Sequence, residues 1–258
     1  MRLSSRRSGF SLVELSIVLV ILGLLVGGIL AGQSLIRASE LRAVATEFNR
    51  YNTAISAFRD KYFAIPGDFT NASGLGWGSY NGDGNGQITL STTAGANENS
   101  TFWVDLAAAG LIEGSYTNVA ATSASVCGTM TPGTNNPRSK MNAGGWNILY
   151  LGSVDVTSVI YYTGSYGNAF LFGAGTTCGT ATATTGLLKS EEAWNIDKKM
   201  DDGQPDSGAW RTFESQGNAT AGSGCGNQAA ANTAIAASSY DLTNTSASAC
   251  SLVIKSGY

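Results

Sequence analysis

A long apolar run near the amino terminus constrains this 258-residue chain more than any other feature. The run covers residues 10–36, follows Arg2, Arg6 and Arg7, and contains a single charged residue, Glu14. A helix needs about 20 apolar residues to cross the hydrocarbon core of a bilayer, so this run is long enough. Because positively charged flanks stay cytoplasmic, we expect the carboxyl-terminal bulk of the chain on the opposite side of the membrane.

A cleaved secretory signal and a plain single-pass anchor are the alternative interpretations of this segment. The run is too long for a signal-peptide core, and no small-residue cleavage site ends it. A plain anchor does not account for Glu14. A carboxylate in hydrocarbon is costly, and intramembrane carboxylates usually have a partner and a function.

The residues around Glu14 resemble the prepilin signature of type IV pilins and type II secretion pseudopilins. A basic leader ends at Gly9, and the sequence Phe-Ser-Leu-Val-Glu begins at Phe10. The resemblance implies that a membrane peptidase cleaves between Gly9 and Phe10 and methylates the new terminal phenylalanine. It also implies that Glu14 meets the terminal ammonium group of a neighbouring subunit during assembly. In an apolar setting such a pair is far stronger than in water.

Beyond the apolar run the pattern becomes that of an amphipathic helix. Apolar residues at spacings of three and four share one helical face: Val44, Phe48, Tyr51, Ile55, Phe58 and Tyr62. Charged residues are expected mostly on other faces: Arg42, Glu47, Arg50, Arg59 and Asp60. We therefore predict a continuous helix over residues 10–62, with a transmembrane and assembly segment at 10–36 and an amphipathic stem at 37–62.

The remainder of the chain, residues 63–258, is predicted to be an extracytoplasmic globular head, and residues 1–9 to be a leader peptide. The head sequence predicts a short helix capped by Ser100 and carrying Leu111, and a second helix at 187–200. Predicted strands are residues 146–151, 154–163, 169–172, 209–213 and 252–255. The expected fold class is α+β, with the long helix packed on an antiparallel sheet of four or five strands in a loop-rich head.

Charge and the lack of histidine argue against several classes of function. After residue 62 the chain has seven basic and fourteen acidic residues, a net charge of −7. Such a head is poorly suited to non-specific nucleic-acid binding, which depends on Lys and Arg. Without histidine there is neither a Ser-His-Asp triad nor a histidine general base. We predict no catalytic residue and do not expect an enzyme.

Four cysteines, all in the head, indicate disulfide bonds: Cys127, Cys178, Cys225 and Cys250. None forms the close-spaced pair that is typical of a zinc site. An even number of cysteines beyond an export segment favours two disulfides in an oxidising compartment. Of the three possible pairings we expect the sequential one, Cys127 with Cys178 and Cys225 with Cys250.

A glycine-rich segment at residues 81–88 places oxygen-bearing side chains at alternate positions, Asn81, Asp83 and Asn85. Calcium loops use this alternation because the ion takes several oxygen ligands, and glycine permits the sharp turn. The match to an EF-hand loop is partial, since its first position is asparagine and its last is not glutamate. In this interpretation Glu98 supplies the missing carboxylate. The alternative is a plain Asx/Gly turn.

A second acidic cluster comprises Asp197, Asp201, Asp202 and Asp206. Asp197 and Asp201 share a helical face, where like charges repel unless something binds them. A cation is one explanation. The other is a turn at Asp202 with the face neutralised by Lys198 and Lys199. The segment also resembles one found in large pilin-like proteins, where it is structural, and we favour a structural role.

The resemblance implies a structural subunit of a type IV pilus or related filament. Two alternatives stay open: a type II secretion pseudopilin, and a minor pilin acting as an adhesin or DNA-uptake module. The implied partners are further copies of the chain, other pilins, a prepilin peptidase, an inner-membrane assembly platform and membrane lipid before assembly. The implied location is the bacterial inner membrane and then a periplasmic or cell-surface filament.

Overall fold

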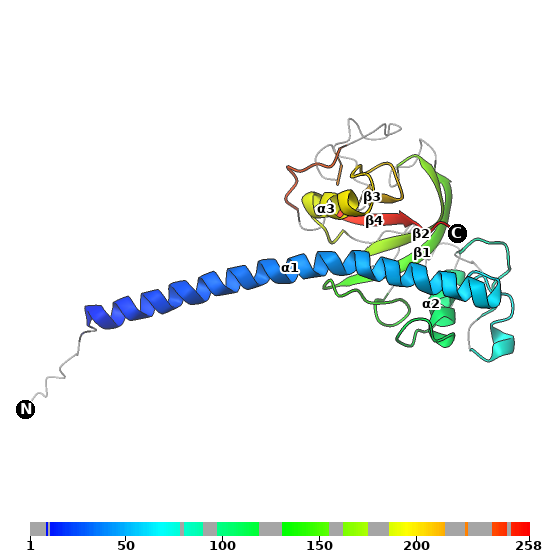
Figure 1. Ribbon diagram of the computed structural model, residues 1–258, viewed down its shortest axis with the longest axis horizontal. Coiled ribbons are helices and arrows are strands. Elements are labelled where there is room, and N and C mark those ends of the chain that lie inside the picture. Colours follow the sequence, from blue (N-terminus) through cyan, green and yellow to red (C-terminus); the bar gives the residue numbers. More distant parts are fainter. Residues whose placement is uncertain are drawn as a thin grey trace, which may run out of the picture. The chain divides into compact units, whose positions relative to one another are not determined.

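Helix α1 (Leu12–Tyr62) is continuous, as the junction of the apolar run with the amphipathic pattern predicts. A computed structural model describes residues 9, 11–77, 80–89, 97–118, 131–154, 162–174, 186–214, 225–226, 239–246 and 249–258 (Figure 1). The chain divides into two compact units, Met1–Glu40 and Leu41–Tyr258.

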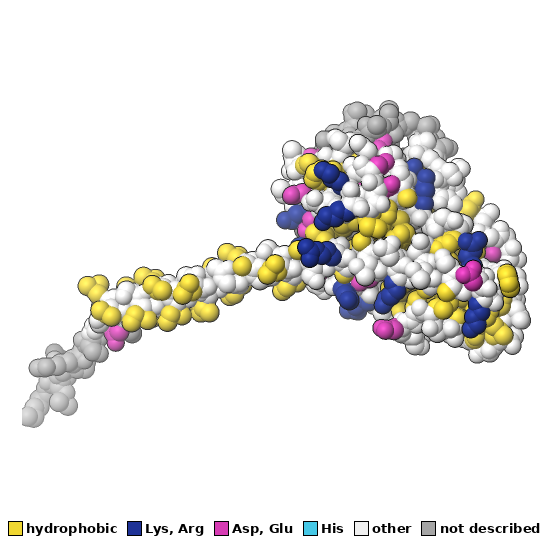
Figure 2. Space-filling model, viewed as in Figure 1, with side chains coloured by type: hydrophobic (Ala, Val, Ile, Leu, Met, Phe, Trp, Pro, Cys, Tyr) yellow, Lys and Arg dark blue, Asp and Glu magenta, His cyan; other side chains and the backbone are white. Residues whose placement is uncertain are grey.

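In the first unit, α1 is apolar around its whole circumference. Its most apolar window has a mean hydropathy of 2.7 and none of it is buried. Hydrophobic side chains cover this part of the helix in Figure 2. Within the described ranges it is the one helix long and apolar enough to cross a membrane. Length and composition therefore agree with the predicted transmembrane segment.

In the second unit, the stem part of α1 buries the face that the spacing predicts. Val44, Tyr51, Ile55 and Phe58 are almost fully buried, Phe48 is buried nearly as deeply, and Tyr62 packs against the same core. One charged residue departs from the expectation. Glu47 is buried too, because its carboxylate accepts hydrogen bonds from the head.

Four antiparallel strands form one sheet in the order β1-β2-β4-β3. The strands are β1 (Gly144–Val154), β2 (Gly164–Ala174), β3 (Trp210–Glu214) and β4 (Cys250–Lys255). Trp146 lies opposite Phe172, and Phe170 lies opposite Ile254. The α+β fold class and the antiparallel sheet are confirmed.

The two faces of the sheet bury different side chains, because successive residues of a strand point to opposite sides. One face packs on α1 and carries Trp146, Ile148, Phe170, Phe172, Leu252 and Ile254. The other face carries Leu149, Tyr166, Ala169, Leu171 and Val253. Phe48 of α1 contacts the rings of Phe170 and Trp210 edge-on, at centroid distances of 5.6 Å and 5.0 Å. This aromatic contact fixes the stem against the sheet.

Two shorter helices flank the sheet. Helix α2 (Glu98–Ala108) packs on β1, and α3 (Ser190–Met200) packs on β3 and β4 (Figure 1). The prediction that Ser100 caps α2 is wrong. The cap is Asn97, whose carbonyl oxygen accepts the amides of Ser100 and Thr101 at 3.1 Å each. Leu111 lies beyond α2, which ends before a left-handed Gly110.

Two further boundaries differ from the prediction. The expected strand at 154–163 is not one strand, since Val154 is the last residue of β1 and residues 162–163 belong to no strand. The stretch between them lies outside the described residues. The expected helix at 187–200 begins later, because Leu188 forms a bridge with Cys250 of β4 before α3 starts.

Candidate functional site

Two local hydrogen bonds cap the amino-terminal end of α1. The backbone N–H of Ser11 donates to Oε2 of Glu14 at 2.9 Å, and the N–H of Val13 donates to the Ser11 hydroxyl oxygen at 3.3 Å. This Ser-x-x-Glu arrangement resembles a capping box, except that the serine oxygen accepts the second helical amide, that of Val13, instead of the third. The two bonds satisfy amides that a helix terminus leaves unpaired. Glu14 therefore already has a hydrogen-bond partner within its own helix.

This local geometry places the Glu14 carboxylate at the point where the sequence predicts a new chain terminus. Gly9 is exposed, and Phe10 lies outside the described residues. A positive charge near this end of the helix would give the Glu14 carboxylate an ionic partner in addition to the hydrogen bond that it accepts from Ser11. The predicted processing and assembly roles of Gly9, Phe10 and Glu14 stay predictions.

The glycine-rich loop is fastened by two carboxylates that come from outside it. Asp68 accepts the amides of Gly84, Asn85 and Gly86 at 2.6, 3.1 and 2.7 Å. Glu98 accepts the amide of Asp83 at 3.2 Å and both the amide and the hydroxyl of Thr89, at 2.8 and 2.7 Å. The loop passes so close to Asp68 that a Cβ on Gly82 would lie 2.3 Å from its Cα.

Within the loop the side chains form turns. Asp83 accepts the Asn85 amide at 3.0 Å, and Asn85 accepts the Gln87 amide at 2.7 Å, which is the Asx-turn pattern. Asn81 is used differently, since its Oδ1 accepts the amide of Ser73 at 2.9 Å. These contacts match the plain-turn alternative of the sequence analysis.

A set of three carboxylates nevertheless converges at this loop. One oxygen each from Asp68, Asp83 and Glu98 lies within 4.8 Å of the others. Burial raises the pKa of Asp68 and of Glu98, and the hydrogen bonds they accept oppose that rise. Carboxylate oxygens at this spacing suit a hard cation such as Ca²⁺. The fold thus brings together two of the predicted calcium ligands, Asp83 and Glu98. The third carboxylate, Asp68, was not indicated by the spacing of residues within the loop.

The second acidic cluster organises the turn between α3 and β3. Asp201 accepts the amides of Ala209 and Trp210, the latter at 3.0 Å. Asp202 accepts the Gln204 amide at 2.9 Å and the Ser207 hydroxyl at 2.6 Å. Such side-chain bonds to the backbone of a turn are what the structural interpretation requires.

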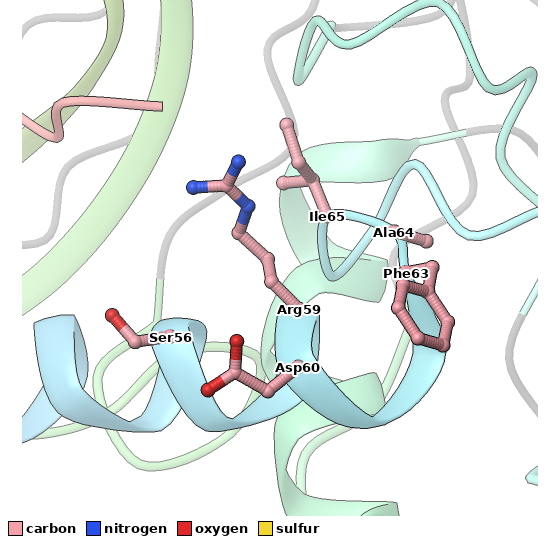
Figure 3. A pocket seen from close by; sticks show the side chains of 6 residues that line it. All are labelled: Ser56, Arg59, Asp60, Phe63, Ala64 and Ile65. Carbon is pink, nitrogen blue, oxygen red and sulfur yellow. The ribbon is translucent and has the colours of Figure 1, made fainter.

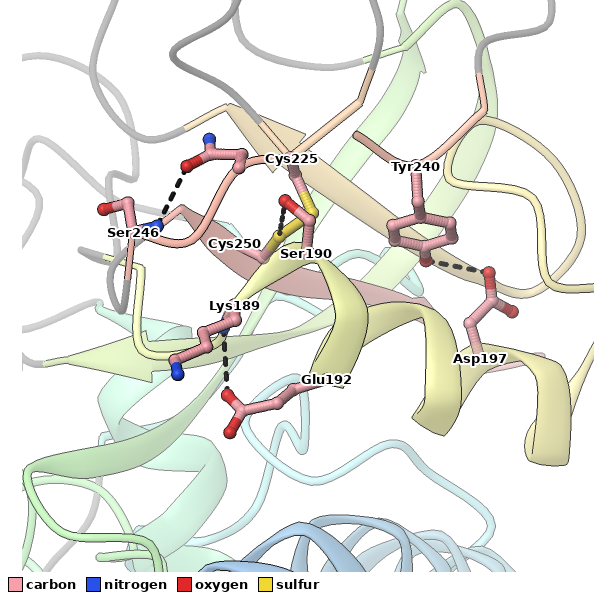
Figure 4. Close-up of a disulfide and its surroundings, with 9 residues drawn as sticks. Lys189, Ser190, Glu192, Asp197, Cys225, Tyr240, Ser246 and Cys250 are labelled. Carbon is pink, nitrogen blue, oxygen red and sulfur yellow. Dashed lines mark hydrogen bonds between the residues drawn. A yellow bond between two sulfur atoms is a disulfide. The ribbon is translucent and has the colours of Figure 1, made fainter. Parts of the chain in front are cut away.

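Asp197 differs from its neighbours because it is buried. Its Oδ2 accepts the hydroxyl of Tyr240 at 2.8 Å (Figure 4). Its Oδ1 accepts the Gly203 amide at 3.3 Å. Burial raises the pKa of Asp197 to about 7, the Tyr240 bond opposes the rise, and the nearby Asp202 and Asp201 add to it. The pKa of Tyr240 is raised by burial and by the Asp197 charge.

The neutralisation of this face by lysines is not seen. Lys198 lies over the ring of Trp194 at 4.6 Å, and among the described residues neither Lys198 nor Lys199 forms an ion pair with the cluster. One oxygen each from Asp197, Asp201 and Asp202 lies within 4.8 Å of the others, whereas Asp206 is not part of that group.

A disulfide joins Cys225 to Cys250, with 4.9 Å between the Cα atoms (Figure 4). This half of the predicted pairing is therefore present. It attaches the segment around Cys225 to the first residue of β4. The other predicted pair, Cys127 and Cys178, lies outside the described residues.

Comparison with known proteins identifies the amino-terminal segment. A family model described as the prokaryotic N-terminal methylation motif matches residues 4–30. No curated protein and no solved structure matches the chain significantly.

Proposed function

We propose that this chain, which carries the methylation motif characteristic of type IV pilins and pseudopilins, is a structural subunit of a type IV pilus or a related filament. The observation that carries the proposal is the position of the motif. The motif covers residues 4–30, so it begins within the basic leader and continues into the apolar part of α1. The same signature supports a structural role rather than a catalytic one.

Assembly would proceed through the amino-terminal helix. A prepilin peptidase would remove residues 1–9, and the new terminal ammonium group would lie within a few residues of Glu14. In the membrane-embedded subunit, the capping box keeps the Glu14 carboxylate hydrogen-bonded. On assembly by the inner-membrane platform, the ammonium group of a neighbouring subunit would pair with this carboxylate. In an apolar setting that charge pair is much stronger than a hydrogen bond to a neutral amide.

The pseudopilin alternative rests on the same motif, and so does the minor pilin that binds a surface or DNA. Deletion of the gene separates the three. Loss of abundant surface filaments supports the pilus subunit, loss of secreted enzymes supports the pseudopilin, and loss of attachment or transformation with filaments intact supports the minor pilin.

The assembly step is tested by Glu14→Gln. Glutamine can still accept the Ser11 amide in a capping box, so the variant removes the charge and keeps the helix terminus. We expect normal leader removal, normal membrane levels and loss of the chain from the sheared filament fraction. Glu40→Gln, the same chemical change elsewhere on α1, is the control and should assemble normally. Normal assembly of Glu14→Gln would refute the proposed role of the charge.

A further inference from the structure

Directly after α1, the chain presents an exposed aromatic ring on a residue with an unfavourable backbone conformation. Phe63 follows the final residue of α1 and has a φ of 54°, in the left-handed region. Glycine usually takes this position after a helix, because a side chain there is strained. The Phe63 side chain is 92% exposed, the largest value among the large hydrophobic side chains that the structure describes. Packing within the chain therefore does not compensate the strain.

Phe63 also borders a hollow in the surface. The hollow has a volume of about 570 Å³ and is lined by Ser56, Arg59, Asp60, Phe63, Ala64 and Ile65 (Figure 3). A projecting ring and a hollow thus occupy the same patch, which we call the Phe63 patch and define by these six residues. Strained backbone that carries an exposed aromatic ring is an observation that points to a function.

Two neighbouring residues give the Phe63 patch opposite charges. Arg59 and Asp60 are both exposed, and among the described residues neither forms an ion pair. The Arg59 guanidinium lies 5.0 Å from the centroid of the Tyr258 ring. Stacking of this kind leaves the N–H groups at the edge of the guanidinium able to bind a carboxylate.

We propose that the Phe63 patch is a self-association surface on which a second copy of this chain docks through a two-fold contact. In such a contact both copies use the same patch. If one residue of the first copy contacts another residue of the second, the reverse contact is also made. Phe63 of each copy would enter the hollow of the other, and Arg59 of each would face Asp60 of the other. A second copy is complementary to the Phe63 patch because one patch contains both members of each pair: a ring and a hollow, and a positive and a negative side chain. To bind an unrelated partner, the patch would need only one member of each pair, for example a hollow without a projecting ring.

A two-fold axis that runs along the stems keeps the two stems parallel and at equal height. That orientation is the one available to two copies anchored in the same membrane, where confinement also raises their effective concentration. The contact differs from the head-to-tail contacts that build a helical filament, so it does not rest on the proposed filament function.

The direct test places the photo-cross-linker benzoylphenylalanine at position 63 of the full chain in its membrane. We expect a product of twice the chain mass in which residue 63 is joined to residues 56–65 of the second copy. The same cross-linker at Leu242, which is also exposed, is the control and should give little of this product. A product with another protein or with lipid, a dimer joined elsewhere, equal dimer yields at both positions, or no product would overturn the proposal.

A charge exchange tests the two-fold pairing. Asp60→Arg alone converts two symmetry-related pairs from attraction to repulsion, and we expect about a tenfold loss of the residue-63 cross-link. The exchanged double variant, Arg59→Asp with Asp60→Arg, should recover the yield to within about twofold, because opposite charges again face each other. An unchanged yield in Asp60→Arg, or no recovery in the double variant, would contradict the pairing. Phe63→Gly should abolish dimer formation as measured with a non-specific cross-linker, and an undiminished dimer would refute the role of the ring.

Discussion

The carboxylate of Glu47, on the stem, accepts a 2.7 Å hydrogen bond from the indole N–H of Trp146, on β1. Its second oxygen accepts the amide of Lys140 at 2.8 Å. Both Glu47 and Trp146 are buried. Hydrogen bonds to a charged group are stronger than neutral ones, so Glu47 is a polar anchor between α1 and the sheet within an otherwise apolar interface.

Removal of this anchor should destabilise the head. Glu47→Ala leaves the buried indole N–H of Trp146 and the partly buried amide of Lys140 without their acceptor, and we expect a loss of about 1–3 kcal/mol in the free energy of unfolding. Urea unfolding of the mature chain in detergent, followed by near-UV circular dichroism, measures the loss. Glu113→Ala, at an exposed position, is the control. Equal stability of the two variants would mean that Glu47 contributes nothing to the packing of the stem.

Phe63→Gly should stabilise the head while it removes an exposed ring. Glycine adopts the φ of 54° without steric cost, and the exposed side chain contributes no buried area. We expect a gain of about 1 kcal/mol, seen as a higher Tm. Phe63→Ala keeps the Cβ and the strain, so its Tm should stay near that of the parent chain. A lower Tm for the glycine variant would show that Phe63 packs more tightly than its exposure indicates.

Asp197 should make the head less stable as pH rises from about 4 to about 7. Its pKa in the folded chain is about 7, above the usual value of 3.8, so the folded state binds a proton that the unfolded state has lost. Stability is therefore greatest below the unfolded pKa and falls as pH rises through the folded one.

The matched variant is Asp197→Asn, which keeps one acceptor for Tyr240 and cannot ionise. Its Tm should exceed that of the parent chain above pH 7 and approach it at pH 4. A parallel pH dependence of the two chains would exclude Asp197 as the cause.

Calcium binding by the glycine-rich loop stays a prediction. If Asp68, Asp83 and Glu98 bind the ion, millimolar Ca²⁺ should raise the Tm of the mature chain, because a ligand that binds only the folded state stabilises it. Asp83→Asn should reduce the shift, and Asp202→Asn, in the other cluster, should reduce it less. An unchanged Tm in Ca²⁺ would leave the loop as an Asx turn fastened by Asp68 and Glu98.

The sequence was informative where the signal is local. Spacings of three and four predicted the buried face of the stem from Val44 to Tyr62, and the predicted end of the helix at residue 62 is correct. Pro66 follows four residues later, and its ring would clash with the carbonyl of Tyr62 in a longer helix. Strands β2 and β4 were predicted because they are central and apolar on both faces. The first residues of β4 were not predicted, since Cys250 pairs with Leu188, which lies far away in the sequence.

Contacts between distant segments could not be predicted. Glu47 looked like a solvent-exposed charge because its partners lie far along the chain, at Lys140 and Trp146. Asp68 precedes the glycine-rich loop, so no spacing within the loop points to it. Tyr240 similarly comes from another segment to meet Asp197. Each acidic cluster therefore includes or contacts a residue from a distant part of the sequence.

The intact mass of the protein from its native membrane tests the central claim most directly. A filament subunit of the pilin type should lack Met1–Gly9, carry one added methyl group on Phe10, and appear in the sheared surface fraction. With both predicted disulfides formed, the four cysteines should also lack their thiol hydrogens. A full-length chain, or one cleaved elsewhere, would contradict the prepilin route and leave a membrane-anchored protein that does not assemble by this mechanism.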